Sequence, residues 1–261
     1  MTFRARVDDP SILKLVVDLL SKIVRTGCFV INRKGIHLTM MDSQEKLLVD
    51  LSLHGFSELE APEEDLHIGL SLSELHKILK LVNKKDKIEL FMDAEMTPNK
   101  LGIKVLEDDG GDSHDTIMHL TTHEAQSINF ILPGMREGLS PITVSSSRFQ
   151  RVFKNMLSLG AKMARISSNN QYIEVCCNFL DISERRDRLG AGVSIDSPSP
   201  HLYNEEFSFV QLSRVLKITS LAPTITIIPS DVLILESEII DAHKTKVGEI
   251  KLYVKPIEAS T

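Results

Sequence analysis

The sequence contains no tryptophan and only three tyrosines and three cysteines among its 261 residues. The cysteine count is odd, Cys176 and Cys177 are neighbours that would make a poor disulfide, and no C-x-x-C spacing occurs. We therefore expect reduced thiols and a reducing compartment. Residues 1–6 lack the apolar segment of a secretory signal, and no apolar run approaches the about 20 residues of a membrane span. These absences predict a protein that is not secreted and has no membrane partner.

Signatures of common enzymes are missing as well. The patterns G-x-x-x-x-G-K-[ST], G-x-G-x-x-G and G-x-S-x-G do not occur, so no nucleotide-binding loop or nucleophilic serine is predicted. His119 and His123, with His114 nearby, have H-x-x-x-H spacing but lack the glutamate of a zinc-binding helix. The acidic turn at 107–112 does not match the spacing of an EF-hand loop. We expect no catalytic residues, no metal and no cofactor, with a small hydrolase or metal enzyme as a distant alternative.

The chain is acidic overall, but its charge is distributed unevenly. It has 36 acidic and 30 basic side chains, a net charge of −6 that at first disfavours binding to nucleic acid. Apolar residues at helical spacing predict helices over residues 11–25, 72–82, 147–159 and 209–221. These four segments carry a net +8, which leaves −14 for the rest of the chain. The segregation favours a surface for sequence-independent contact with phosphates; the alternative is that each helix presents an ordinary solvated face.

The basic residues of the four predicted helices are the candidate DNA contacts. Several lie three residues apart and away from the apolar stripe, so that a pair shares one helix face. The candidates are Lys14, Lys22, Lys77, Lys80, Arg151, Lys154, Arg214 and Lys217. Aromatic residues are scarce on these faces, which disfavours stacking on the bases of single strands.

The order of predicted elements repeats along the chain. Residues 75–80 and 212–217 both read L-x-[KR]-[IV]-L-K, and the apolar stripe of the first helix overlays that of the third. Short β-rich runs lie between these helices, whereas residues 183–204 read as a loop-rich stretch. We therefore predict a duplicated α+β domain, with halves at 1–120 and 141–261 joined by a connector at 121–140.

Together with the repeat and the basic helices, several short segments make the sequence resemble the proliferating cell nuclear antigen family. These proteins are the eukaryotic-type DNA sliding clamps, and the sequence resembles a divergent member. The segments that carry the resemblance are Phe3–Arg6, Ser11–Lys14, Gly35–Ser43, Lys77–Lys80 and Tyr253–Glu258. It implies an α+β clamp fold in which each domain packs two helices on antiparallel sheet, and a head-to-tail homotrimeric ring around double-stranded DNA. Leu15 and Ser21 stand where relatives often have lysine, so we expect a slightly weaker grip on DNA.

The resemblance also implies a function that is not enzymatic. A clamp tethers DNA polymerase and other replication and repair proteins to the template and so raises processivity. An ATP-dependent clamp loader would open the ring, and the expected location is the nucleus, or the site of viral DNA replication for a virus-encoded chain. Two alternatives within the clamps are a subunit of a heterotrimeric checkpoint clamp and a monomeric processivity factor.

Clients of this family dock short PIP-box-like peptides into an apolar pocket beside the connector. The resemblance places that pocket at Met41, Leu48, Ile131, Leu132, Pro133, Val232, Tyr253, Val254 and Pro256. From the residues alone, 130–133 is an apolar patch within a polar connector, which needs a burial partner; the alternative is that it packs on its own domain. Glu45, Lys46 and Lys255 depart from the family pattern and leave the client preference open.

Overall fold

The computed structural model describes residues 3–93, 95, 97–107, 115–125, 128, 130–179, 183–190 and 202–257. The acidic turn beyond residue 107, His114 and Glu258 lie outside these ranges. Within them, no helix combines the length and the apolar character needed to cross a membrane. The chain forms two compact units, each assembled from several segments. The first unit comprises Met1–Met40, Val49–Phe130 and Glu238–Ile250, and the second comprises Met41–Leu48, Ile131–Ser237 and Lys251–Thr261.

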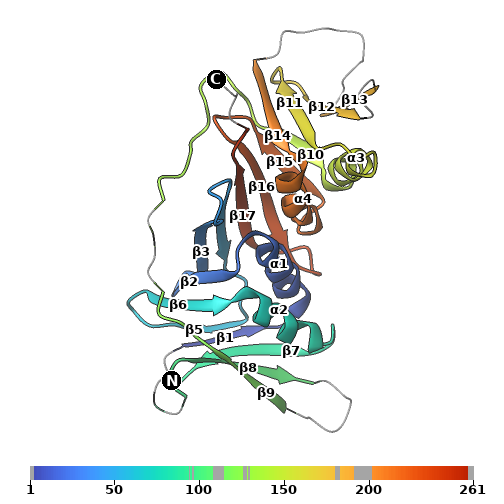
Figure 1. Cartoon of the computed structure of the whole chain (residues 1–261). Helices are drawn as coiled ribbons and strands as arrows, with labels where there is room; N and C mark the ends of the chain where they lie inside the picture. Colours follow the sequence, from blue (N-terminus) through green and yellow to red (C-terminus); the bar gives the residue numbers. More distant parts are fainter. Residues whose placement is uncertain are drawn as a thin grey trace. The chain divides into compact units, whose positions relative to one another are not determined.

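The first unit contains a five-stranded antiparallel sheet in the order β5-β1-β7-β8-β9. Its strands are β1 (Phe3–Val7), β5 (Glu58–Glu60), β7 (Lys87–Met92), β8 (Lys100–Leu106) and β9 (Asp115–Thr121). Figure 1 shows β7, β8 and β9 following one another across this sheet. The order leaves β9 at a sheet edge, with only one strand beside it.

A second group of strands follows the first helix. They are β2 (Thr26–Asn32), β3 (Gly35–Met41), β4 (Leu47–Leu53) and β6 (Leu66–Ser71), and β2 pairs antiparallel with both β3 and β6. Gly35 has a φ of +138°, and a Cβ atom there would lie 2.0 Å from the carbonyl oxygen of Leu53. Only glycine fits this turn, because both the left-handed conformation and the close approach exclude a side chain.

Helices α1 (Pro10–Ile23) and α2 (Leu72–Leu81) lie side by side in the first unit (Figure 1). Helix α1 begins where the Asp9 side chain accepts a hydrogen bond from the backbone N–H of Ser11, with Pro10 as the first helical residue. Ser71 caps α2 through the N–H of Glu74. Buried leucines and valines at helical spacing form the inner faces, so both helices match their sequence-based prediction to within two residues.

The second unit contains a four-stranded antiparallel sheet in the order β13-β12-β11-β14. Its strands are β11 (Met163–Ser168), β12 (Ile173–Phe179), β13 (Ser183–Leu189) and β14 (Tyr203–Ser208). The prediction of a loop over residues 183–204 is therefore wrong for 183–189, where β13 pairs along its length with β12. Alternating charges hid this strand, since neither of its faces reads as apolar.

The remaining elements include helices α3 (Ser146–Ser158) and α4 (Phe209–Val215), followed by a 3₁₀ helix, η1 (Leu216–Ser220). Strands β10 (Ile142–Ser145), β15 (Thr224–Ile228), β16 (Leu233–Ile240) and β17 (Lys246–Val254) complete the order. Phe153 lies between the rings of Phe149 and Phe209, at centroid distances of 4.3 and 6.1 Å. The predicted single helix over 209–221 thus tightens into a 3₁₀ turn after Val215. Within the described residues each unit has two α-helices beside antiparallel sheet, which confirms the α+β class.

Candidate functional site

Two pairs of basic side chains lie exposed on helices α2 and α3. Lys77 and Lys80 are three residues apart on α2, and Arg151 and Lys154 have the same spacing on α3. The opposite faces of these helices are buried by leucines on α2 and by Phe149, Val152, Phe153 and Met156 on α3. Across the part of the chain that the structure describes, no hydrogen bond or ion pair engages any of the four side chains. They are therefore available to a phosphate without first leaving another partner.

The other predicted DNA contacts are placed differently. Lys14 on α1 is half-buried, and its Nζ donates a hydrogen bond to the backbone carbonyl of Val82, just past the end of α2. Lys22 is exposed and lies 3.4 Å from a carboxylate oxygen of Asp18. Lys217, on η1, is half-buried. A phosphate would have to compete with the partners that Lys14 and Lys22 already have.

Arg214, the eighth candidate, forms a partly buried ion pair within the second unit. Its Nη1 lies 2.8 Å from Oδ2 of Asp42, whose side chain is only 1% exposed. The other carboxylate oxygen of Asp42 accepts hydrogen bonds from the backbone N–H groups of Lys46 and Leu47, each at 2.9 Å. Burial raises the pKa of Asp42, but these two backbone bonds and Arg214 more than offset it, so the net pKa lies below its ordinary value. Asp42 is thus a charged group that organises the loop after β3.

All nine residues predicted for the peptide pocket belong to the second unit. Leu48, Tyr253 and Val254 are buried, whereas Met41, Pro133, Val232 and Pro256 are half-buried. The backbone N–H of Lys255 donates to the carbonyl of Lys46 at 2.9 Å, which brings the segment after β17 against the loop between β3 and β4. Ser230 Oγ donates to the carbonyl of Gly134 at 2.7 Å and holds the connector beside the turn before Val232.

The connector itself exposes apolar side chains. Ile131 is 98% exposed and Leu132 is 39% exposed, although Leu139 further along is buried. Ile128 and Met135 are exposed as well. The alternative in which residues 130–133 pack on their own domain does not account for Ile131, which the chain leaves uncovered. Exposed apolar groups beside a polar surface are typical of a protein-binding patch.

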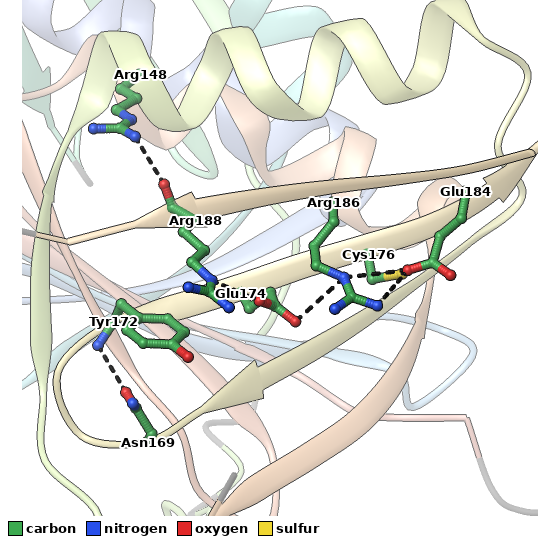
Figure 2. A network of polar contacts seen from close by, with 8 residues as sticks. All are labelled: Arg148, Asn169, Tyr172, Glu174, Cys176, Glu184, Arg186 and Arg188. Atoms are coloured by element: carbon green, nitrogen blue, oxygen red, sulfur yellow. Dashed lines mark hydrogen bonds and ion pairs between the residues drawn. The ribbon is translucent and has the colours of Figure 1, made fainter. Parts of the chain in front are cut away.

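A polar network joins side chains of the neighbouring strands β12 and β13 (Figure 2). The buried Glu174 carboxylate accepts from Nε of Arg188 at 2.8 Å, and the guanidinium of Arg188 lies 4.7 Å from the centre of the Tyr172 ring. Arg186 reaches Glu174 at 3.6 Å and Glu184 at 2.7 Å. The charged residues at the start of the predicted loop-rich stretch therefore lie on strand β13 and pair with one another and with Glu174.

The thiol of Cys176 belongs to the same network and donates to Oε1 of Glu184 at 3.0 Å (Figure 2). Burial, followed by the hydrogen bond and the negative charge of Glu184, raises the pKa of Cys176 to about 11. Such a thiol is neutral near pH 7 and is a weak nucleophile.

The histidines considered for a metal site do not come together with other ligands. Among the described residues, no group of three or more His, Cys, Asp or Glu side chains is placed to hold a metal ion. His119 instead contacts Phe91 edge-on, with ring centres 6.2 Å apart. The backbone of His123 pairs with that of Gly69 in an isolated β-bridge. His114 lies outside the described residues.

The comparisons with known proteins point in one direction. The family model described as the N-terminal domain of proliferating cell nuclear antigen matches residues 2–127. The chain is 25% identical to proliferating cell nuclear antigen of Chaetomium thermophilum, covering 85% of this chain and 86% of the relative. It is 26% identical to proliferating cell nuclear antigen 2 of Drosophila melanogaster, covering 97% and 96%. The crystal structure of proliferating cellular nuclear antigen from Entamoeba histolytica superimposes with a TM-score of 0.80 at 22% identity, covering 98% of this chain and 99% of that one. The predicted clamp fold is thereby confirmed.

Proposed function

Because the chain belongs to the proliferating cell nuclear antigen family of DNA sliding clamps, we propose that it assembles as a head-to-tail homotrimer around double-stranded DNA. The family serves DNA replication and repair by holding polymerases and other proteins on the template. A tethered polymerase meets its primer end at high effective concentration, so processivity rises although the clamp makes and breaks no bond. The proposed protein is not an enzyme and needs no cofactor.

The observation that carries the proposal is a pair of exposed basic faces on α2 and α3, which have no partner within the described ranges, in a chain that is acidic overall. Lys77, Lys80, Arg151 and Lys154 are exposed and offer point contacts to phosphates without base readout. Lys14, Lys22, Arg214 and Lys217 are proposed as weaker contributors, because their side chains are half-buried or already paired. Weak contacts suit a clamp, since ring topology retains the DNA while the phosphate contacts remain easy to exchange.

Two different sheet edges support the head-to-tail assembly. Strand β9 ends the sheet of the first unit, and β13 ends the four-stranded sheet of the second. An open edge presents unpaired backbone donors and acceptors, so β9 of one copy is a suitable partner for β13 of the next. Such a contact joins unlike surfaces, and it closes into a ring when the rotation between copies permits. Ile117 on β9, which is 52% exposed, would be covered by it.

The second proposed activity is the capture of client peptides by the nine-residue pocket of the second unit. Exposed Ile131 and half-buried Met41, Pro133 and Val232 supply an apolar surface for the aromatic plugs of a PIP-box-like helix. We further propose that an ATP-dependent clamp loader is a partner of the protein. The proposed domains are residues 1–120 and 141–261, with a connector at 121–140. The proposed location is the nucleus, or the site of viral replication for a virus-encoded chain.

The topology of DNA binding gives the decisive experiment. After loading by a eukaryotic-type clamp loader, the protein should stay on nicked circular DNA through gel filtration and leave once the circle is linearised. Equal loss from both forms would contradict a topological clamp. Light scattering of the free protein separates the alternatives, because a homotrimer has three times the mass of the chain, whereas a stable monomer favours a monomeric factor or a subunit that needs different partners.

A further inference from the structure

We infer that Arg214 is a positioning residue for the peptide pocket, through its ion pair with the buried Asp42. The inference rests on the proposed function of that pocket and adds the residue that holds its loop in shape. It also assigns Arg214 a role other than phosphate contact.

The loop between β3 and β4 is folded around one carboxylate. Oδ1 of Asp42 accepts the N–H groups of Lys46 and Leu47, and the N–H of Asp42 donates to the carbonyl of Leu47 at 2.8 Å. Glu45 adopts a left-handed conformation with φ of 55°, and its N–H donates to the carbonyl of Asp42. Hydrogen bonds between Asp42 and residues 45–47 therefore hold the two ends of the turn together, around the exposed residues 43–45.

This turn joins two members of the pocket and supports two others. Met41 directly precedes Asp42, and Leu48 directly follows Leu47. The carbonyl of Lys46 accepts from the N–H of Lys255, the residue between Val254 and Pro256. A shift of the turn would consequently move the two strand ends and the segment after β17 that together form one side of the pocket.

Arg214 supplies the only positive charge that the structure places on this carboxylate among the described residues. The Asp42 side chain is 1% exposed, and that of Arg214 is 24% exposed. Removing Arg214 would take the opposite charge away from the buried Asp42 carboxylate and leave it only the two backbone N–H donors, which is unfavourable for a buried charge. The carboxylate would be held less firmly in its present geometry, and any turn towards water would weaken its bonds to Lys46 and Leu47.

The bond to Asp42 restricts how the Arg214 guanidinium could turn towards a DNA phosphate. One N–H of Nη1 reaches Asp42 at 2.8 Å, so a phosphate would have to share the remaining donors of the group, and the exposed neighbour one turn earlier on α4 is the apolar Val210. This contrasts with Lys154 on α3, which is exposed, lies in the same unit and has no recorded partner within the described residues. Lys154 is therefore the matched control for the loss of one positive charge.

The test compares Arg214→Met, Arg214→Lys and Lys154→Met in the full-length assembly. Amide exchange at Lys46 and Leu47, followed by NMR or mass spectrometry, reports the turn without any peptide. Fluorescence anisotropy of a labelled synthetic PIP-box peptide reports the pocket, and the salt dependence of binding to a short DNA duplex reports phosphate contacts. Arg214→Met retains an unbranched aliphatic side chain without the charge, and Arg214→Lys retains the positive charge on a single nitrogen.

Arg214→Met should speed exchange at both amides and weaken the peptide about tenfold, the change that about 1.4 kcal/mol produces. Arg214→Lys should change amide exchange and peptide affinity less than Arg214→Met does, and Lys154→Met should change neither of these two quantities. Lys154→Met should instead lower the salt slope by about 0.9, the contribution of one phosphate contact. If Arg214→Met lowers the slope and leaves the amides unchanged, Arg214 is a phosphate contact and the inference is overturned. If the wild-type protein does not bind the peptide, the proposed pocket fails, while amide exchange still decides whether Arg214 holds the turn.

Discussion

The basic residues of the four helices fall into two groups that the residue types alone do not distinguish. Lys77, Lys80, Arg151 and Lys154 extend into solvent without a recorded partner among the described residues. Lys14 and Arg214 have the same charge and a similar helical setting, yet each is bound to a group of its own unit. On these helices, a positive charge is available to an external phosphate only where the fold has not already paired it with a group of its own.

The largest effect should follow from reversing the unpartnered group. Replacing Lys77, Lys80, Arg151 and Lys154 together by Glu changes the charge by −8 per chain and turns attraction for phosphates into repulsion. Polymerase stimulation on a primed circular template should fall by about two orders of magnitude or more, in keeping with the loss of several phosphate contacts.

The control for this reversal is the oligomer itself. Because the four side chains are exposed and have no partner among the described residues, light scattering should give the same mass for variant and wild type, and the melting temperature should change little. Unchanged stimulation by an intact ring would show that these faces are ordinary solvated surface.

The sequence was sufficient for the features that depend on local periodicity. Apolar residues three and four apart located α1, α2 and α3, and the same periodicity placed Lys77 and Lys80 on the outer face of α2. It did not predict that α4 ends at Val215, because buried apolar residues continue into the 3₁₀ helix at Leu216 and Ile218. Strand β13 was not predicted because its charged side chains show no apolar alternation. They pair instead with residues of the neighbouring strand, such as Glu174, which the local sequence does not reveal.

The candidate sites were less accessible to sequence reasoning. The Arg214–Asp42 pair joins residues 172 positions apart, and nothing in either local sequence indicates that the carboxylate is buried. The only signal for Asp42 was its place in the Met41–Asp42–Ser43 motif of the family resemblance. The pocket residues likewise came from resemblance, whereas the exposure of Ile131 is a property that only the three-dimensional structure reveals.

An intermediate effect on the free energy of unfolding should come from the charge of Asp42, the partner of Arg214, and this effect should depend on pH. The pKa of Asp42 is lower in the folded protein than its ordinary value of 3.8. Asp42 therefore stabilises the fold fully above that value, and the contribution is lost as the pH falls towards the folded-state pKa. In urea titrations, Asp42→Asn should be clearly less stable than wild type at neutral pH.

The gap between the two proteins should narrow as the pH falls from 3.8 towards the lower pKa of folded Asp42, because the wild-type carboxylate takes up a proton over that range. Asp50 offers a matched control, since it is less buried and accepts a single hydrogen bond, from the hydroxyl of Thr39. Asp50→Asn should show a smaller difference at neutral pH. A constant difference between wild type and Asp42→Asn at every pH would mean that the side-chain charge does not contribute.

The smallest effect, and the one that separates the two groups most directly, compares single lysines on adjacent helices. Lys80→Ala removes an exposed charge, so it should leave the free energy of unfolding nearly unchanged and lower the salt slope of duplex binding by about 0.9. Lys14→Ala removes the donor to the Val82 carbonyl, so it should cost about 1 kcal/mol of stability and change the slope less. Urea denaturation and anisotropy titrations at several salt concentrations measure both quantities on the same samples. The opposite result would be that Lys80 stabilises the fold and Lys14 sets the salt slope. In that case Lys14 would have to leave the Val82 carbonyl when DNA binds, and the proposed division into DNA-contacting and internally bonded basic residues would be wrong.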